Sequence, residues 1–102
     1  MFRIEITASA EADLDGITDY IGRMLCNPPA VATLLETIES ACARIAEMPD
    51  VFPLCADSRL AELGYRKAVV RSYVMVYEID LPGRVARIMR FFHESENYVD
   101  KL

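Results

Sequence analysis

Residues 65–92 read YRKAVVRSYVMVYEIDLPGRVARIMRFF, and this composition predicts three consecutive β-strands. Valine, isoleucine, tyrosine and phenylalanine, which favour strands, dominate the segments 65–70, 73–80 and 84–92. Two residues separate the first two segments, and a Pro-Gly turn precedes the third. Joins this short place neighbouring strands antiparallel, so we expect a three-stranded antiparallel meander.

The N-terminal half predicts one further strand and two helices. Residues 2–7 alternate apolar and polar side chains, which is typical of a strand with one buried face. Residues 9–25 carry apolar side chains at helical spacing. Asn27 and Pro28 suit the start of a second helix that runs to Met48. The short join between the helices predicts an antiparallel helical hairpin.

Length and composition predict one globular α+β domain over residues 1–102. The chain is 53% hydrophobic and 26% charged, which is typical of folded proteins. The elements predict an N-terminal strand, a helical hairpin and the meander, forming one sheet with the helices on one face. We place the first strand at the sheet edge beside the last strand. The net charge of −5 argues against broad, non-specific binding of nucleic acid.

Strict alternation assigns the larger apolar face of the sheet to the helices and leaves a second apolar group on the opposite face. That group consists of Val69, Val74, Val76, Met89 and Phe91. An exposed group of this kind marks a partner site. The alternative is that the tail, residues 94–102, folds back and buries the group itself with Tyr98, Val99 and Leu102.

Positive charge is concentrated in the β half, which suggests an anionic partner on the sheet. The cations there are Arg66, Lys67, Arg71, Arg84, Arg87 and Arg90. Alternation places Arg90 on the helix-covered face, where an unpaired charge is costly. We therefore predict an ion pair between Arg90 and Asp13 or Glu11 of the first helix.

No metal site or cofactor is expected. The three cysteines are far apart in the sequence, only one histidine is present, and no glycine-rich phosphate loop occurs. No apolar run reaches the length of a membrane span. The N-terminus is unlike a secretory signal. We expect a cytoplasmic protein with reduced thiols and no membrane partner.

Four segments, taken in order, carry a family pattern. They are residues 10–14 with Ile17 and 19–21, residues 27–28 with Ala30, Ala32 and 38–49, residues 63–67 with 73–77, and residues 87–93. This set resembles the RelE/ParE superfamily of type II toxin–antitoxin toxins and covers nearly the whole chain outside residues 50–62. The resemblance implies a small bacterial toxin of the plasmid-stabilisation type, held inactive by a cognate antitoxin. RelE-like members cleave mRNA on the ribosome, and ParE-like members inhibit DNA gyrase.

Two departures from the RelE-like pattern favour the ParE-like branch. The nucleases carry an arginine where this chain has Val74, and basic residues where it has Glu94 and Glu96. A carboxylate beside a scissile phosphate repels it. The ending His93-x-Ser95-x-Asn97 is similar to that of ParE-like members. The resemblance therefore implies a gyrase inhibitor that acts by binding. The alternatives are a ribosome-dependent mRNA endonuclease or an inactive member that keeps only antitoxin binding.

His93 and Tyr98 are the candidates for proton transfer if the chain is an enzyme. The structural alternatives are a strand-end histidine bonded to backbone and a tail tyrosine that packs its ring. We expect antitoxin acids to meet Arg66, Lys67 and Arg87. The full set predicted to bind antitoxin or target is Arg66, Lys67, Val74, Val76, Arg87, Met89, Phe91, His93 and Asn97. The sequence leaves the oligomeric state open, with a homodimer as one option.

Overall fold

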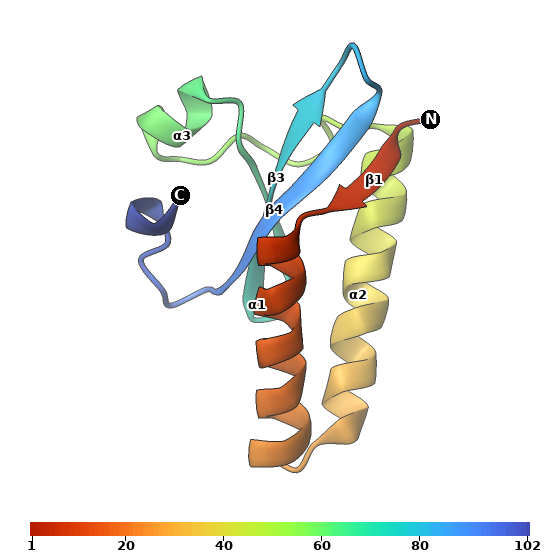
Figure 1. Ribbon diagram of the computed structural model, residues 1–102, viewed down its shortest axis with the longest axis vertical. Helices are drawn as coiled ribbons and strands as arrows, with labels where there is room; N and C mark the ends of the chain where they lie inside the picture. The colour runs from red at the N-terminus through yellow and green to blue at the C-terminus, as the bar shows by residue number, and fades with distance from the viewer.

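A computed structural model describes residues 1–102 and has an α+β architecture with one mixed sheet, as predicted (Figure 1). None of its helices combines the length and the apolar character needed to cross a bilayer. In chain order the elements are β1 (Arg3–Ile6), α1 (Ala8–Asp19), η1 (Tyr20–Met24), α2 (Pro28–Glu47), α3 (Ser58–Glu62), β2 (Arg66–Val70), β3 (Tyr73–Asp80), β4 (Val85–His93) and η2 (Val99–Lys101).

The strands follow the order β1-β4-β3-β2, which confirms the meander and the edge position of the first strand. β2, β3 and β4 pair antiparallel, and β1 pairs parallel with β4 from Arg3 opposite Val85 to Ile6 opposite Ile88. β1 pairs with only the first part of β4, so the rest of β4 has no strand on that side. α1 begins just beyond β1 and lies along the uncovered end of β4 (Figure 1).

Local signals explain both long helices. The Asn27 side chain accepts the Ala30 N–H at the start of α2, and Pro28 occupies the first helical position, as predicted. The Thr7 hydroxyl caps α1 by accepting the Ala10 N–H, and it also donates to the Met89 carbonyl of β4 at 2.9 Å. The cap therefore ties the start of α1 to the sheet.

The main core lies between the helical hairpin and one face of the sheet. Leu34, Ile38 and Ile45 of α2 are buried there with Met75 and Tyr77 of β3. Their spacing follows the helical repeat on α2 and the two-residue alternation on β3. The buried hydroxyl of Tyr77 donates a hydrogen bond to the Pro49 carbonyl, just beyond α2, at 2.6 Å, so this polar atom is satisfied.

A β-bulge in β4 changes the predicted faces. Val76 lies opposite Arg90 while Tyr77 lies opposite Ile88, so Met89 has no partner. One extra residue reverses the alternation beyond it. Phe91 therefore belongs to the core beneath the helices, whereas Phe92, which alternation assigned there, lies in a second cluster on the opposite face.

Candidate functional site

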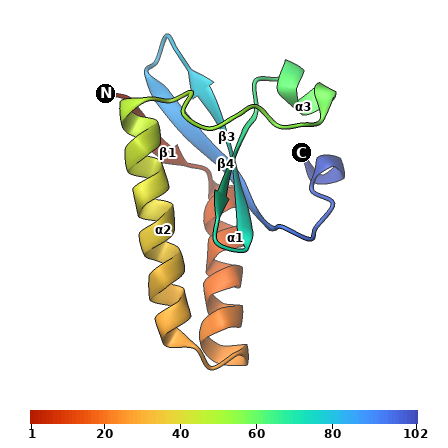
Figure 2. The same cartoon turned by 180° about the vertical axis from the view of Figure 1, so that it is seen from behind.

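The second apolar cluster occupies the sheet face away from the helical hairpin and is closed by the chain itself. Its buried members are Cys55, Leu60, Val74, Val76 and Phe92, and Tyr65, Tyr98, Val99 and Leu102 pack against them. Figure 2 shows α3 and the C-terminal turn together on this side. The expectation of an open apolar face is wrong for Val74 and Val76, which the tail covers as in the alternative, together with Leu60 of α3 and Cys55.

This closure and the bulge in β4 together change the status of three predicted contact residues. Val74, Val76 and Phe91 are all buried, and Phe91 lies beneath the helices. They are therefore not available at the surface as the chain stands. Val69 of β2 is not in this cluster and stays 59% exposed. Met89 is partly buried at the bulge.

Stacking and an arginine hold the tail against the sheet and α3, and an ion pair within the tail fixes its turn. The ring of Tyr98 stacks on Phe92, with centroids 5.4 Å apart and an interplanar angle of 18°. Arg59 of α3 donates through Nη2 to the Val99 carbonyl at 2.7 Å. Lys101 pairs with Glu96 at 2.5 Å. The hydrogen bond from Lys101 and the one from the His93 backbone N–H lower the pKa of Glu96.

His93 lies where β4 ends and the tail turns. Its Nδ1 accepts the Ser95 N–H at 3.1 Å and lies 2.7 Å from the Ser95 hydroxyl. The ring meets Tyr73 edge-on at 5.3 Å. The histidine thus shapes the turn through a backbone bond, and no other group of the chain bonds to its Nε2. Asn97 is exposed and donates only to Asp100, at 3.3 Å.

The three predicted partner-binding cations differ in what they already contact. Arg87 donates to Glu5 and to Glu78, both at 3.0 Å, and these hydrogen bonds raise its pKa. Its charge is therefore compensated within the sheet. Arg66 donates only to the Phe52 carbonyl, at 2.8 Å, and neither Arg66 nor Lys67 has an acidic partner. Free positive charge thus remains on β2.

The predicted pair between Arg90 and Asp13 is confirmed, but Arg90 reaches it from the other face. Arg90 Nε and Nη2 donate to the carboxylate at 2.6 and 3.1 Å, and these bonds raise the pKa of Arg90. The Phe91 N–H donates to the same carboxylate at 3.0 Å. Asp13 thus satisfies a strand N–H where β1 no longer covers β4, and it joins α1 to the sheet.

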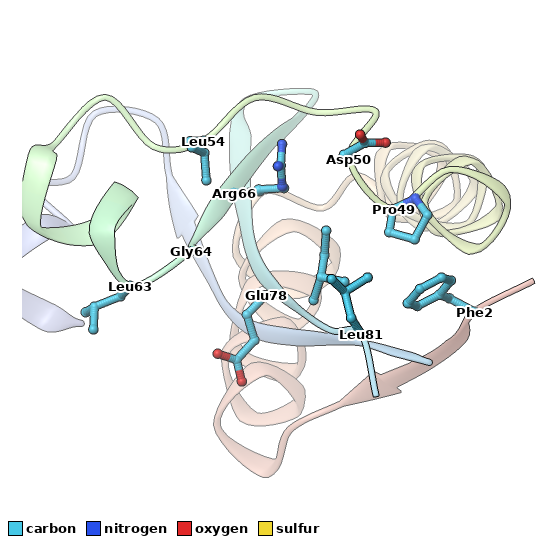
Figure 3. A pocket seen from close by; sticks show the side chains of 10 residues that line it. Phe2, Pro49, Asp50, Leu54, Leu63, Gly64, Arg66, Glu78 and Leu81 are labelled. Atoms are coloured by element: carbon cyan, nitrogen blue, oxygen red, sulfur yellow. The ribbon is translucent and has the colours of Figure 1, made fainter. Parts of the chain in front are cut away.

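A groove beside β3, here called the β3-edge groove, was not predicted from the sequence. It encloses about 470 Å³. Figure 3 shows Leu54, Leu63 and Gly64 on one side of it and Phe2 and Pro49 on the other. Apart from Phe2, which belongs to the alternating segment 2–7, these residues come from the region 49–64, which has no regular periodicity, so the sequence pattern did not predict that they meet.

Comparison with protein families gives a match over nearly the whole chain. The family described as the ParE toxin of the type II toxin–antitoxin system parDE matches residues 4–98. The chain belongs to the ParE toxin family. It is therefore a toxin of the RelE/ParE superfamily, as the resemblance implied. A comparison with curated proteins finds no significant match.

Solved structures share the fold of this ParE-family chain. A chain of the chromosomal ParDE system from P. aeruginosa is 18% identical with a TM-score of 0.71, and the alignment covers 91% of this chain and 96% of that one. For the RelBE2 complex of Mycobacterium tuberculosis the values are 21% and 0.64, with 93% of each chain covered. The E. coli RelBE complex is 13% identical with a TM-score of 0.61, and the alignment covers 94% of this chain and 100% of that one.

Proposed function

We propose that this ParE-family toxin inhibits DNA gyrase by binding it and that a cognate antitoxin, encoded by the adjacent gene, neutralises it. The family match over residues 4–98 carries the proposal, because that family is defined by the toxin of a parDE pair. The solved relatives support the antitoxin as partner, since two of them are described as toxin–antitoxin complexes and the third as a ParDE system.

The end of β4 supports binding over phosphate chemistry. Glu94 lies in the turn that follows His93 and has no basic partner, whereas Glu96 in the same turn is paired with Lys101. Val74, at the position where the nucleases carry an arginine, is buried. A phosphate brought to His93 would therefore meet negative charge, and the expected arginine would be absent.

The test of gyrase inhibition uses the purified full chain. We expect it to reduce the supercoiling of relaxed plasmid by gyrase, and we expect the purified product of the adjacent gene to restore supercoiling when mixed in first. Expression of the chain alone should arrest bacterial growth. Unchanged supercoiling at a large excess of the chain over gyrase would contradict the proposal.

The second candidate is the ribosome-dependent mRNA endonuclease, which the unbonded Nε2 of His93 favours. Mapping of mRNA 5′ ends after induction separates the two functions. If mRNA is cut at the ribosomal A site by the wild-type chain but not by His93→Gln, and gyrase supercoiling is unaffected, the endonuclease interpretation replaces gyrase inhibition. Normal growth together with binding of the adjacent gene product would identify an inactive member that keeps only antitoxin binding.

A further inference from the structure

The tip of the helical hairpin exposes three large apolar side chains, here called the hairpin-tip patch. They are Tyr20, Met24 and Leu25, with 49%, 74% and 56% of their surface accessible. The hairpin projects beyond the sheet, so its tip lies away from both termini and from the C-terminal turn that closes the second apolar cluster (Figures 1 and 2). The chain itself therefore leaves this patch open.

A π-helical turn places these side chains outside the core. Regular helical spacing predicts Met24 and Leu25 on the same face as the buried Ile21, which lies three and four residues before them. In η1, however, the Leu25 N–H donates to the Tyr20 carbonyl, five residues back, at 3.1 Å. This wider turn holds one extra residue and rotates the residues that follow, so Ile21 stays buried while Met24 and Leu25 are exposed.

The join after the π-helical turn adopts a second unusual conformation. Cys26 has φ +49°, in the left-handed region that residues other than glycine rarely occupy. The Asn27 N–H donates to the Ile21 carbonyl at 3.1 Å, which fixes this join. π-helical turns and left-handed residues are uncommon, and both are concentrated at functional sites. Here they occur together in the segment 20–26, where they present apolar surface to solvent.

The helical hairpin carries the whole net charge of the chain. Residues 8–47 contain seven acidic side chains and two arginines, a net charge of −5, whereas the other residues contain nine of each sign. Asp15 and Asp19 are exposed within two turns of Tyr20, and only Asp19 has a basic partner, Arg23 at 3.3 Å. Uncompensated negative charge therefore lies beside the hairpin-tip patch and favours a basic partner surface.

The partner that fits this surface is a protein with an apolar depression surrounded by basic residues. Gyrase, the proposed target, holds DNA, and proteins that hold DNA do so with lysine and arginine side chains. A second copy of this chain would bring an equally negative hairpin, which disfavours a dimer through the tip. The negative surface of a membrane would repel the hairpin for the same reason.

We propose that the hairpin-tip patch is the surface through which this chain contacts gyrase. Tyr20, Met24 and Leu25 enter an apolar depression, and the acidic side chains of the hairpin meet basic residues around it. A few clustered aromatic and apolar side chains dominate the affinity of such an interface, and the charges at its rim speed association. The inference rests on the proposed function, because it takes gyrase as the partner.

The experiment measures inhibition of gyrase supercoiling by the purified full chain. We expect the double variant Met24→Ser, Leu25→Ser to need about 10- to 100-fold more protein for half inhibition. The matched control is Met48→Ser, Leu81→Ser, which removes the same two kinds of side chain, 57% and 70% exposed, at the opposite end of the molecule (Figure 1). The control should change the half-inhibiting concentration less than about twofold. Thermal unfolding confirms that both variants are folded.

Charge reversal tests the chemistry of the partner surface. Asp15→Lys should raise the half-inhibiting concentration about threefold or more, because a basic partner surface would repel the new cation. Glu62→Lys reverses an exposed acid of α3, away from the hairpin tip, and should leave inhibition unchanged. Stronger inhibition by Asp15→Lys would overturn the assignment of a basic partner surface.

Three results would overturn the inference and leave gyrase inhibition standing. The first is inhibition by the double variant at wild-type concentrations. The second is loss of its binding to the purified adjacent gene product with inhibition intact, which would assign the patch to the antitoxin. The third is a wild-type dimer in sedimentation that the double variant dissociates while inhibition is intact, which would assign the patch to a second copy. Unchanged supercoiling with the wild-type chain would overturn both the inference and the proposed function.

Discussion

Replacing Asp13 by alanine should destabilise the fold more than any other single removal of surface charge. The carboxylate accepts two hydrogen bonds from Arg90 and one from the Phe91 N–H. The Asp13 side chain is 18% exposed and that of Arg90 is 30% exposed, so water only partly replaces these bonds. Two charge-assisted bonds and one backbone bond, reduced for this exposure, give an expected loss of about 2–3 kcal/mol.

Urea unfolding of Asp13→Ala, Arg90→Met and the double variant measures this contribution. We expect the losses to be non-additive by about 1–2 kcal/mol, because the two side chains interact directly. Asp13→Asn keeps one oxygen for the Phe91 N–H and should lose less than Asp13→Ala. A loss below about 0.5 kcal/mol for Asp13→Ala, or additive losses in the cycle, would refute the role of this pair in joining α1 to the sheet.

Three further outcomes follow from the tail and the backbone. Because the fold lowers the pKa of Glu96, its contribution to stability is complete above the ordinary glutamate pKa of about 4.3 and is lost as the pH falls through the lowered value. Wild type and Glu96→Gln should therefore differ in urea midpoint at pH 7 and converge in acid; a constant difference would contradict this. Tyr98→Ala removes the stack on Phe92 and should cost about 1–2 kcal/mol in urea unfolding, whereas Tyr98→Phe keeps the ring and should cost much less. Gly64 has φ +82° with open space around it, so Gly64→Ala should lower the thermal midpoint through about 1 kcal/mol of backbone strain. Gly16→Ala within α1 should instead raise the thermal midpoint, through about 1 kcal/mol of added helix stability. If both glycine variants shifted the thermal midpoint in the same direction, this reasoning would be refuted.

Several features could be predicted because they depend on neighbours in the sequence. Asn27 and Pro28 predict the start of α2 through local capping and a fixed φ. Alternation and short joins predict the strand order of the meander. The pair of Arg90 with Asp13 was predicted from the cost of an unpaired cation on a covered face, and this energetic argument holds although the face was wrongly assigned.

The candidate contact surface was predicted less well, because it depends on one extra residue in β4. Alternation continued through Met89 assigns Phe92 to the helix side and Phe91 to the opposite side. The bulge exchanges these two positions. Whether a strand pair accommodates a bulge depends on the contacts on both sides of β4. Here these contacts include the hydrogen bond from the Thr7 hydroxyl to the Met89 carbonyl. Such a contact joins residues 82 positions apart.

Local physics therefore specifies the helices, the strands and their order, since caps, turns and alternation act over a few residues. Closure of the second sheet face and formation of the β3-edge groove require segments that are distant in the chain to meet. Tyr98 reaches Phe92 only after the tail turns back, and Leu54 and Leu63 come close to Leu81 only when two loops pack around the end of β3. Their positions follow from the free energy of burying apolar surface across the whole domain, which no short stretch of sequence contains.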